Sequence, residues 1–354
     1  MDFGLPPIVV GPISFCLLVF ASWCVGEGGE ILGTHYDASV LGGIVIAWLN
    51  TAPEAIFFIT ALQSNNPRFA VGAVSGSTIV VCTVALGVCL WIGGSSVKRG
   101  RITLQPAVKT QCYILLCSVI VTTAIAAVGF NIILGGIGIS FYCMFLFYSL
   151  RHKEADAKED EETGHLEAEE EEEEVVPVQK GIVYLVVGAV LIFGFSSPFI
   201  NCVVQFATYL EVNPILLAFF LAPIASEAPE ILESISLSRK GNIQSINVAF
   251  SNLIGGTITK TTILCGLFSL IGYTKGFAWE SPSYSLCLML LGISAAIAAA
   301  IGAFSSSLSK YHGLLLLSVF VIIAIIQYAT NSRLDSEVFA DESFGHDDAH
   351  HIKT

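Results

Sequence analysis

The sequence has few charged residues. Asp, Glu, Lys and Arg make up 13% of its 354 residues, whereas soluble domains carry about 25%. Hydrophobic residues make up 54% of the chain, and the mean hydropathy is +0.75. This composition excludes an ordinary soluble domain and predicts a protein that crosses a membrane several times.

Basic residues are scarcer than acidic ones, 16 against 29, so the formal net charge is −13. Two segments carry all of that charge: 151–180 has 13 acids and 4 bases, and 331–354 has 6 acids and 2 bases. No basic patch is left to bind phosphates, so we expect no nucleic-acid partner. The run Glu169 to Glu174 cannot form a buried core, so we expect 151–180 to be disordered or a solvated helix.

Cysteine motifs and a secretory signal are also lacking. None of the ten cysteines forms a C-x-x-C pair, and all lie in or beside apolar runs, as small buried hydrophobic residues do. The N-terminus has no basic region of the kind that precedes a signal peptide's apolar core. We therefore interpret the first apolar run as a membrane span.

Ten apolar runs of about 20 residues predict ten transmembrane helices. The expected fold is an all-α polytopic membrane protein built as two inverted five-helix repeats. The expected domains are the first repeat at 1–150, an acidic cytosolic loop at 151–180, the second repeat at 181–330 and an acidic, histidine-containing tail at 331–354. The approximate limits of the spans are 7–25, 38–63, 68–93, 111–129, 131–150, 181–206, 213–238, 243–272, 282–304 and 311–330.

The inverted repeat is predicted from one alignment. Thr34–Glu54 aligns without gaps with Leu210–Glu230, and both segments end in Ala-Pro-Glu. The second and seventh spans are an odd number of crossings apart, so they run in opposite directions. Inverted repeats place substrate near the middle of the membrane, where the halves meet. Lysine and arginine are concentrated at one set of span ends, eleven against four, which predicts a cytosolic acidic loop.

Four acids lie within predicted spans: Glu54, Glu227, Glu230 and Glu233. One charge at the bilayer centre costs roughly 2.5–3.5 kcal/mol, so four unpaired charges would cost on the order of 10–14 kcal/mol. Lys260 is the one basic residue in the interior of a span. We expect it to pair with one of these acids, although it could also extend toward the interface or stand in for a coupling ion. One lysine cannot neutralise four acids, so a bound cation is the simplest compensation.

Proline next to two of the acids adds further oxygen ligands. Pro53 and Pro229 free the carbonyl oxygens of Leu49 and Ala225 from helical hydrogen bonds. Oxygen ligands without histidine or cysteine suit hard cations such as Ca²⁺. The candidate metal ligands are Glu54, Glu230, Asn50, Thr51, Ser77, Thr78, Ser226, Glu227, Asn247, Ser251 and Asn252.

These two segments resemble the α-repeats of the calcium/cation antiporter superfamily, a Gly-Thr-Ser-x-Pro-Glu-like stretch followed by a Gly-Asn-x-x-Gly-Ser-Asn-like one. The matching residues are Thr51, Pro53, Glu54, Gly72, Gly76 and Ser77 in the first repeat and Ser226, Pro229, Glu230, Asn247, Ser251 and Asn252 in the second. The resemblance implies cation exchange by alternating access, with the two glutamates as the principal Ca²⁺ ligands and the first and sixth spans sliding as a gate.

The sequence departs from this pattern at two positions. Ala73 replaces the usual Asn of the first repeat, and Glu227 replaces the usual Ser or Thr of the second. Proline before each glutamate resembles the sodium-coupled branches, whereas Asn50 and the acidic run resemble the proton-coupled ones. We therefore expect Ca²⁺/Na⁺ exchange, with Ca²⁺/H⁺ exchange as the alternative, in a plasma or organelle membrane.

A cation channel is an alternative from another class, although a channel usually repeats about a central axis and exposes a continuous filter. An enzyme is not expected, because the spans show neither a nucleophile–base pair nor a set of histidine metal ligands. No cofactor is expected beyond the transported ions, Ca²⁺ and a monovalent counter-ion, and the only other expected partner is the lipid bilayer.

Overall fold

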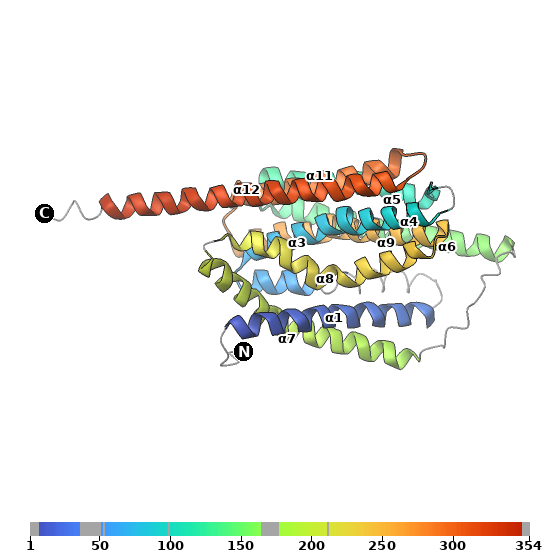
Figure 1. Cartoon of the computed structure of the whole chain (residues 1–354), viewed down its shortest axis with the longest axis horizontal. Helices are drawn as coiled ribbons and strands as arrows, with labels where there is room; N and C mark the ends of the chain where they lie inside the picture. The colour runs from blue at the N-terminus through green and yellow to red at the C-terminus, as the bar shows by residue number, and fades with distance from the viewer. Residues whose placement is uncertain are drawn as a thin grey trace.

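The computed structural model describes residues 7–35, 51, 54–97, 100–163, 177–210 and 212–348. Apart from turns and one isolated two-residue bridge between Ile102 and Leu308, this part of the chain is helical. Figure 1 shows the helices packed side by side along one direction. Their bounds are α1 Pro7–His35, a short helix Glu54–Gln63, α3 Pro67–Ile79, η1 Val80–Ala85, α4 Leu86–Ser96, α5 Pro106–Val128, α6 Ile132–Thr163, α7 Val178–Tyr209, α8 Pro214–Arg239, α9 Ile243–Thr259, η2 Lys260–Leu264, α10 Cys265–Lys275, α11 Ser283–Phe304 and α12 Lys310–Asp348.

Eight helices in the described part of the chain are long and apolar enough to cross a membrane, and α8 makes a ninth if its two bent halves count as one span. All nine coincide with predicted spans. The expected span 38–63 lies mostly outside the described residues, which include only Thr51 and Glu54–Gln63 of it. Of the acidic loop, residues 151–163 continue α6 as a helix, and 164–176 lie outside the described residues.

The two halves pack head to tail. Gly11 of α1 lies against Cys202 of α7 and Gly28 lies against Gly181, so these helices are antiparallel. Figure 1 shows them side by side along one edge of the bundle. The predicted inverted relation between the first and sixth spans is therefore confirmed by their packing.

The third and eighth spans are also antiparallel. Each is a continuous helix in which a π-helical stretch, η1 or η2, separates two α-helical parts. Gly241, before α9, lies beside Ser96 at the end of α4, while Arg68 of α3 forms an ion pair with Glu280, after α10. The outer helices follow the same symmetry, because α6 packs on α10 and α12 packs on α4.

Helix α8 is bent by 42° between Ile224 and Ser226. The bend follows from Pro223 and Pro229, which remove two helical N–H donors on either side of it. The backbone of α3 approaches α8 closely at Gly72 and Gly76, where a Cβ atom would overlap the carbonyl oxygens of Ile215 and Phe219. This contact holds α3 against the bent helix.

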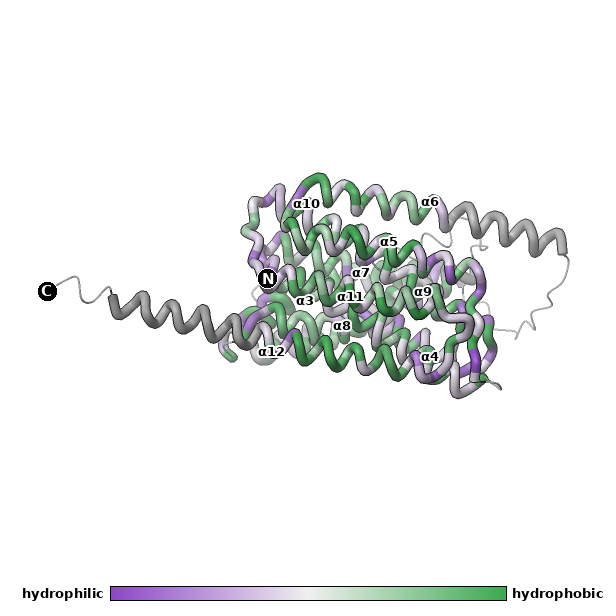
Figure 2. Tube along the Cα trace, turned by 90° about the horizontal axis from the view of Figure 1, so that it is seen from above, coloured by the Kyte–Doolittle hydropathy of each residue, from purple (hydrophilic) through white to green (hydrophobic). Residues whose placement is uncertain are grey.

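The exterior of the helix bundle is apolar. Large apolar side chains such as Val190 and Phe193 of α7 and Ile322 and Ile325 of α12 are exposed along whole helices. Figure 2 shows hydrophobic residues along much of α5 and along the coloured parts of α6 and α12. An apolar surface of this extent is the surface that lipid covers.

Candidate cation site

A buried lysine lies among three buried carboxylates. The Lys260 side chain is 0% exposed, and its Nζ lies 2.7 Å from Glu227 Oε2, 3.1 Å from Glu54 Oε2 and 3.9 Å from Glu230 Oε2. We call Glu54, Glu227, Glu230 and Lys260 the charged cluster. The expectation that Lys260 pairs with an acid is confirmed, and it contacts three acids rather than one. The formal charge of the cluster is −2.

Local structure brings these residues together from both halves of the chain. Glu227 and Glu230 are three residues apart on α8 and so share one face of that helix, just past the bend. Glu54 comes from the first half, on the helix that runs to Gln63. Lys260 is the first residue of η2, and π-helical turns occur frequently at functional sites.

The carboxylates have unused ligand capacity. Both oxygens of Glu54 and Oε2 of Glu230 are buried without a hydrogen-bond partner among the described residues. A buried carboxylate oxygen normally accepts hydrogen bonds, because an unpaired one has lost its hydration without replacement. A cation is the partner that such oxygens can bind. Within the described chain, however, no three His, Cys, Asp or Glu side chains are arranged to chelate one ion. The three glutamates are gathered around the lysine ammonium instead.

A small cavity adjoins Glu54. It is lined by Glu54, Phe57, Phe58, Ala73, Val74, Ser77, Ala222 and Ser226. The Ser226 hydroxyl donates to Glu227 Oε1 at 3.1 Å and to the Ala222 carbonyl at 3.2 Å. The structure therefore brings two predicted ligands, Ser77 and Ser226, to the edge of the charged cluster.

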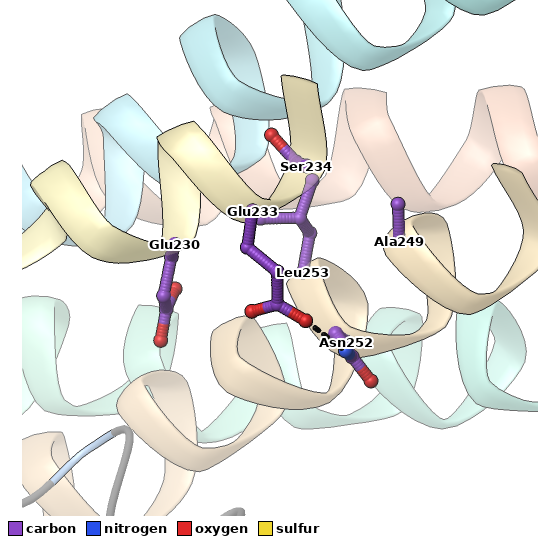
Figure 3. A pocket seen from close by; sticks show the side chains of 6 residues that line it. All are labelled: Glu230, Glu233, Ser234, Ala249, Asn252 and Leu253. Atoms are coloured by element: carbon purple, nitrogen blue, oxygen red, sulfur yellow. Dashed lines mark hydrogen bonds between the residues drawn. The ribbon is translucent and has the colours of Figure 1, made fainter. Parts of the chain in front are cut away.

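A second small cavity adjoins Glu230 (Figure 3). It is lined by Glu230, Glu233, Ser234, Ala249, Asn252 and Leu253. Glu230 and Glu233 both extend from α8 toward α9, where the Asn252 amide donates to Glu233 Oε1 at 3.2 Å. Glu233 and Asn252 are exposed, so this cavity has a polar mouth.

The two cavities are related by the repeat. The alignment that pairs Glu54 with Glu230 also pairs Phe57 with Glu233 and Phe58 with Ser234. The first-half residues that line one cavity therefore correspond to residues that line the other, although Ala222 and Ser226 of the second half also line the first cavity. They differ in character, because Phe57 and Phe58 are 6% and 1% exposed and cover the first cavity with aromatic rings. The carboxylate of Glu233 replaces one of those rings in the second cavity.

Other predicted ligands lie in different surroundings. The Asn247 amide donates to the carbonyls of Thr103 and Ile243, and its oxygen accepts from the Gln105 N–H. The structure does not bring Asn247 to the charged cluster: all its polar atoms join α9 to the segment before α5. Its match to a ligand motif did not reveal this role, because the 103–105 segment is distant in sequence.

Hydroxyl groups on the predicted ligands are also engaged elsewhere. Ser251 donates to Gln111 Oε1 at 2.8 Å, and Thr78 donates to the Val74 carbonyl at 2.7 Å within its own helix. Thr51 is buried, at 4% exposed. Asn50 and Pro53 lie outside the described residues.

The sequence-based set did not include every residue beside the glutamates. Phe57 and Phe58 border Glu54, and Gly256 faces Glu230, because a Cβ atom at Gly256 would lie 3.8 Å from Glu230 Oε2. The repeat alignment could have identified the two phenylalanines as neighbours of the site, since it places them opposite Glu233 and Ser234.

Comparison with known proteins gives one family for both halves. The family model "Sodium/calcium exchanger protein" matches residues 7–151 and again residues 180–329. Sodium/calcium exchanger NCL2 of Oryza sativa subsp. japonica is 24% identical over 139 residues, which are 38% of this chain and 24% of that protein. This match therefore covers about a quarter of the length of the plant exchanger. An uncharacterized membrane protein of Methanocaldococcus jannaschii is 20% identical over 316 residues, covering 88% of this chain and 94% of that protein.

Solved structures share the fold. The crystal structure of the H⁺/Ca²⁺ exchanger CAX aligns with a TM-score of 0.74 at 16% identity, over 99% of this chain and 92% of the other. The sodium-calcium exchanger NCX_Mj aligns with a TM-score of 0.60 at 20% identity, over 89% of this chain and 97% of the other. At these identities the likeness describes the architecture rather than the ions.

Proposed function

The chain belongs to the sodium/calcium exchanger protein family, a family of multi-pass membrane transporters, and we propose that it exchanges Ca²⁺ for a monovalent cation by alternating access. The observation that carries this proposal is the set of buried carboxylate oxygens without a hydrogen-bond partner, contributed by both halves of the chain and gathered around the Lys260 ammonium. Ca²⁺ takes six to eight oxygen ligands, with carboxylates preferred. One divalent cation also matches the formal charge of −2 on the charged cluster.

Glu54 and Glu230 are the proposed principal ligands of Ca²⁺. They occupy equivalent positions in the two repeats, and both have oxygens without a hydrogen-bond partner. Ser77 and Ser226 line the adjoining cavity and add hydroxyl oxygens. Thr51 and Asn50 stay in the proposed ligand set from the sequence pattern.

Alternating access is supported by the two repeat-related cavities on either side of the charged cluster. The polar mouth at Glu233 and Asn252 gives one route to Glu230, while Phe57 and Phe58 cover the equivalent route to Glu54. Helices α1 and α7 form the proposed sliding gate. Gly26 of α1 lies against Pro229 of α8, one residue before Glu230, so movement of α1 is transmitted directly to the ligand helix.

Na⁺ is the proposed counter-ion, because proline precedes each principal glutamate as in the sodium-coupled branches. H⁺ is the second candidate, because Asn50 and the acidic run Glu169–Glu174 resemble the proton-coupled branches. Protons and Na⁺ compete for the same carboxylates, so either ion suits the charged cluster chemically.

Proteoliposomes test the proposal. Uptake of ⁴⁵Ca²⁺ is measured under an outward Na⁺ gradient, then under an outward proton gradient, then with neither. We expect uptake with one gradient and background without a gradient, and we expect Glu54→Gln and Glu230→Gln to reduce uptake to background. Lys240→Gln, at the exposed end of α8, is the matched control and should transport normally. Flux that needs no counter-ion would indicate a channel, and normal rates in both glutamate variants would refute the proposed site.

A further inference from the structure

The ammonium of Lys260 occupies the position that a small cation would take among three carboxylates. It is held by contacts of 2.7, 3.1 and 3.9 Å to acids from both halves of the chain. The repeat alignment places Val84 of η1 opposite Lys260, so only the second half supplies this charge. The other acid of the ligand helix, Glu233, is exposed at the cavity mouth rather than buried.

Lys260 and Glu227 form a matched pair. Glu227 makes the shortest contact to the lysine, and the two side chains are 2% and 0% exposed. The repeat alignment places Thr51 opposite Glu227, so the second half alone carries this acid. The extra negative charge and the extra positive charge therefore compensate each other, which leaves Glu54 and Glu230 with a formal charge of −2 for transported ions.

We propose that Lys260 is a tethered cation that permanently fills one monovalent position of the charged cluster. This inference rests on the proposed exchange activity and goes beyond it by setting the stoichiometry. Uncompensated charge is costly inside a membrane, so the forms of the transporter that reorient are those in which the bound ions neutralise the cluster. With Lys260 in place, one Ca²⁺ or two monovalent cations neutralise it. The exchange is then electroneutral.

Removing the tethered charge changes the number of ions exchanged. In Lys260→Met the cluster has three carboxylates and no ammonium, so it needs three monovalent charges, or Ca²⁺ with one monovalent ion. The variant then carries Ca²⁺ together with one monovalent cation in one direction and three monovalent cations in the other. Its exchange stays electroneutral, but Ca²⁺ crosses only with a co-transported monovalent cation. The double variant Glu227→Gln with Lys260→Met returns the cluster to −2 and removes the need for that cation.

The test measures exchange of external ⁴⁵Ca²⁺ for internal Ca²⁺ in proteoliposomes, first without Na⁺ at alkaline pH and then with Na⁺ on both sides. In wild type Ca²⁺ alone neutralises the cluster, so exchange should proceed without Na⁺. In Lys260→Met Ca²⁺ alone leaves one uncompensated negative charge, so exchange should fall to background without Na⁺ and be restored by it. Lys260→Arg, which keeps the charge, and the double variant should not require Na⁺.

The outcomes separate this inference from the proposed function. A wild-type protein without counter-ion-dependent Ca²⁺ flux would refute the exchange activity itself. A wild-type exchanger whose Ca²⁺-for-Ca²⁺ exchange requires Na⁺ would overturn only the role of Lys260, as would a Lys260→Met variant that does not require it.

A second measurement, equilibrium Ca²⁺ binding to the purified protein in detergent, tests the proposal even if Lys260→Met does not transport. A vacated monovalent position leaves three carboxylates free to bind the metal, so Lys260→Met should bind Ca²⁺ at least about ten-fold more tightly than wild type, a change of 1.4 kcal/mol. Unchanged or weaker binding by a folded variant would overturn the proposal.

Discussion

The ion pair between Lys260 and Glu227 should make a large contribution to stability that an equally short surface pair does not make. The two pairs offer a matched comparison. Lys260 Nζ lies 2.7 Å from Glu227 Oε2 with side chains 0% and 2% exposed, and Arg68 Nε lies 2.7 Å from Glu280 Oε2 with side chains 52% and 36% exposed. Distance is the same in both pairs, so burial is the variable.

The magnitude follows from the effective dielectric constant. At 2.7 Å, two unit charges attract by about 6 kcal/mol at an effective dielectric of about 20 and by about 1.5 kcal/mol in bulk water. Desolvation offsets much of the attraction inside the protein, yet removing one partner of a buried pair costs about 3–5 kcal/mol because the other charge is left uncompensated. Glu54 and Glu230 retain part of the lysine's interaction, so we expect a coupling energy of about 2–3 kcal/mol for the buried pair. Exposed pairs give about 0–1 kcal/mol.

A double-mutant cycle measures both values. Lys260→Met, Glu227→Gln and their combination are unfolded by SDS in mixed micelles without Ca²⁺, followed by circular dichroism. Lys260→Met alone should be strongly destabilised, and adding Glu227→Gln should recover much of the loss, since a neutral pair of similar size replaces the ion pair. Arg68→Met and Glu280→Gln form the control cycle. Coupling energies that agree within about 0.5 kcal/mol between the two cycles would refute the reasoning.

Two further predictions concern packing outside the charged cluster. Gly76→Ala should destabilise the protein by about 1–3 kcal/mol, because the added Cβ overlaps the backbone of Phe219. The control Gly136→Ala places a Cβ that meets no atom within 4 Å and should leave stability unchanged. Unfolding in mixed micelles measures both variants, and equal losses of stability would contradict the close contact between α3 and α8. Asn247→Ala should lower the free energy of unfolding by about 1–3 kcal/mol, because it leaves the polar groups of segment 103–105 unpaired. In equilibrium Ca²⁺ binding, its affinity should stay within about two-fold of wild type. A large loss of Ca²⁺ affinity in a stable variant would return Asn247 to the ligand set.

The helical architecture and its inverted symmetry were predictable because they depend on local composition. Apolar runs of membrane-spanning length predicted every span that the structure describes. The odd number of crossings between the two Ala-Pro-Glu segments predicted antiparallel halves, which the contacts of Gly11 and Gly28 with α7 confirm. Pro229 predicted a broken helical hydrogen bond at Ala225, and α8 is bent by 42° between Ile224 and Ser226.

The individual partners of polar side chains were much less predictable. Ser251 and Asn247 match the family's motif, yet they bond to Gln111 and to segment 103–105, more than 130 residues away in sequence. A motif specifies which residue types stand at which spacing, whereas a hydrogen bond depends on where another helix places its donors and acceptors. Such partners are visible only when the helices are packed.

By itself, the sequence determined that this protein crosses a membrane in two inverted halves and that a few acids lie within its spans, since span length, proline position and repeat similarity are properties of the chain alone. Only the tertiary structure decided that Lys260 contacts Glu54, Glu227 and Glu230 together, because these residues come from different helices and from both halves. The reason is electrostatic: in a dry interior the charges must compensate one another in space, and the order of residues along the chain does not specify those distances.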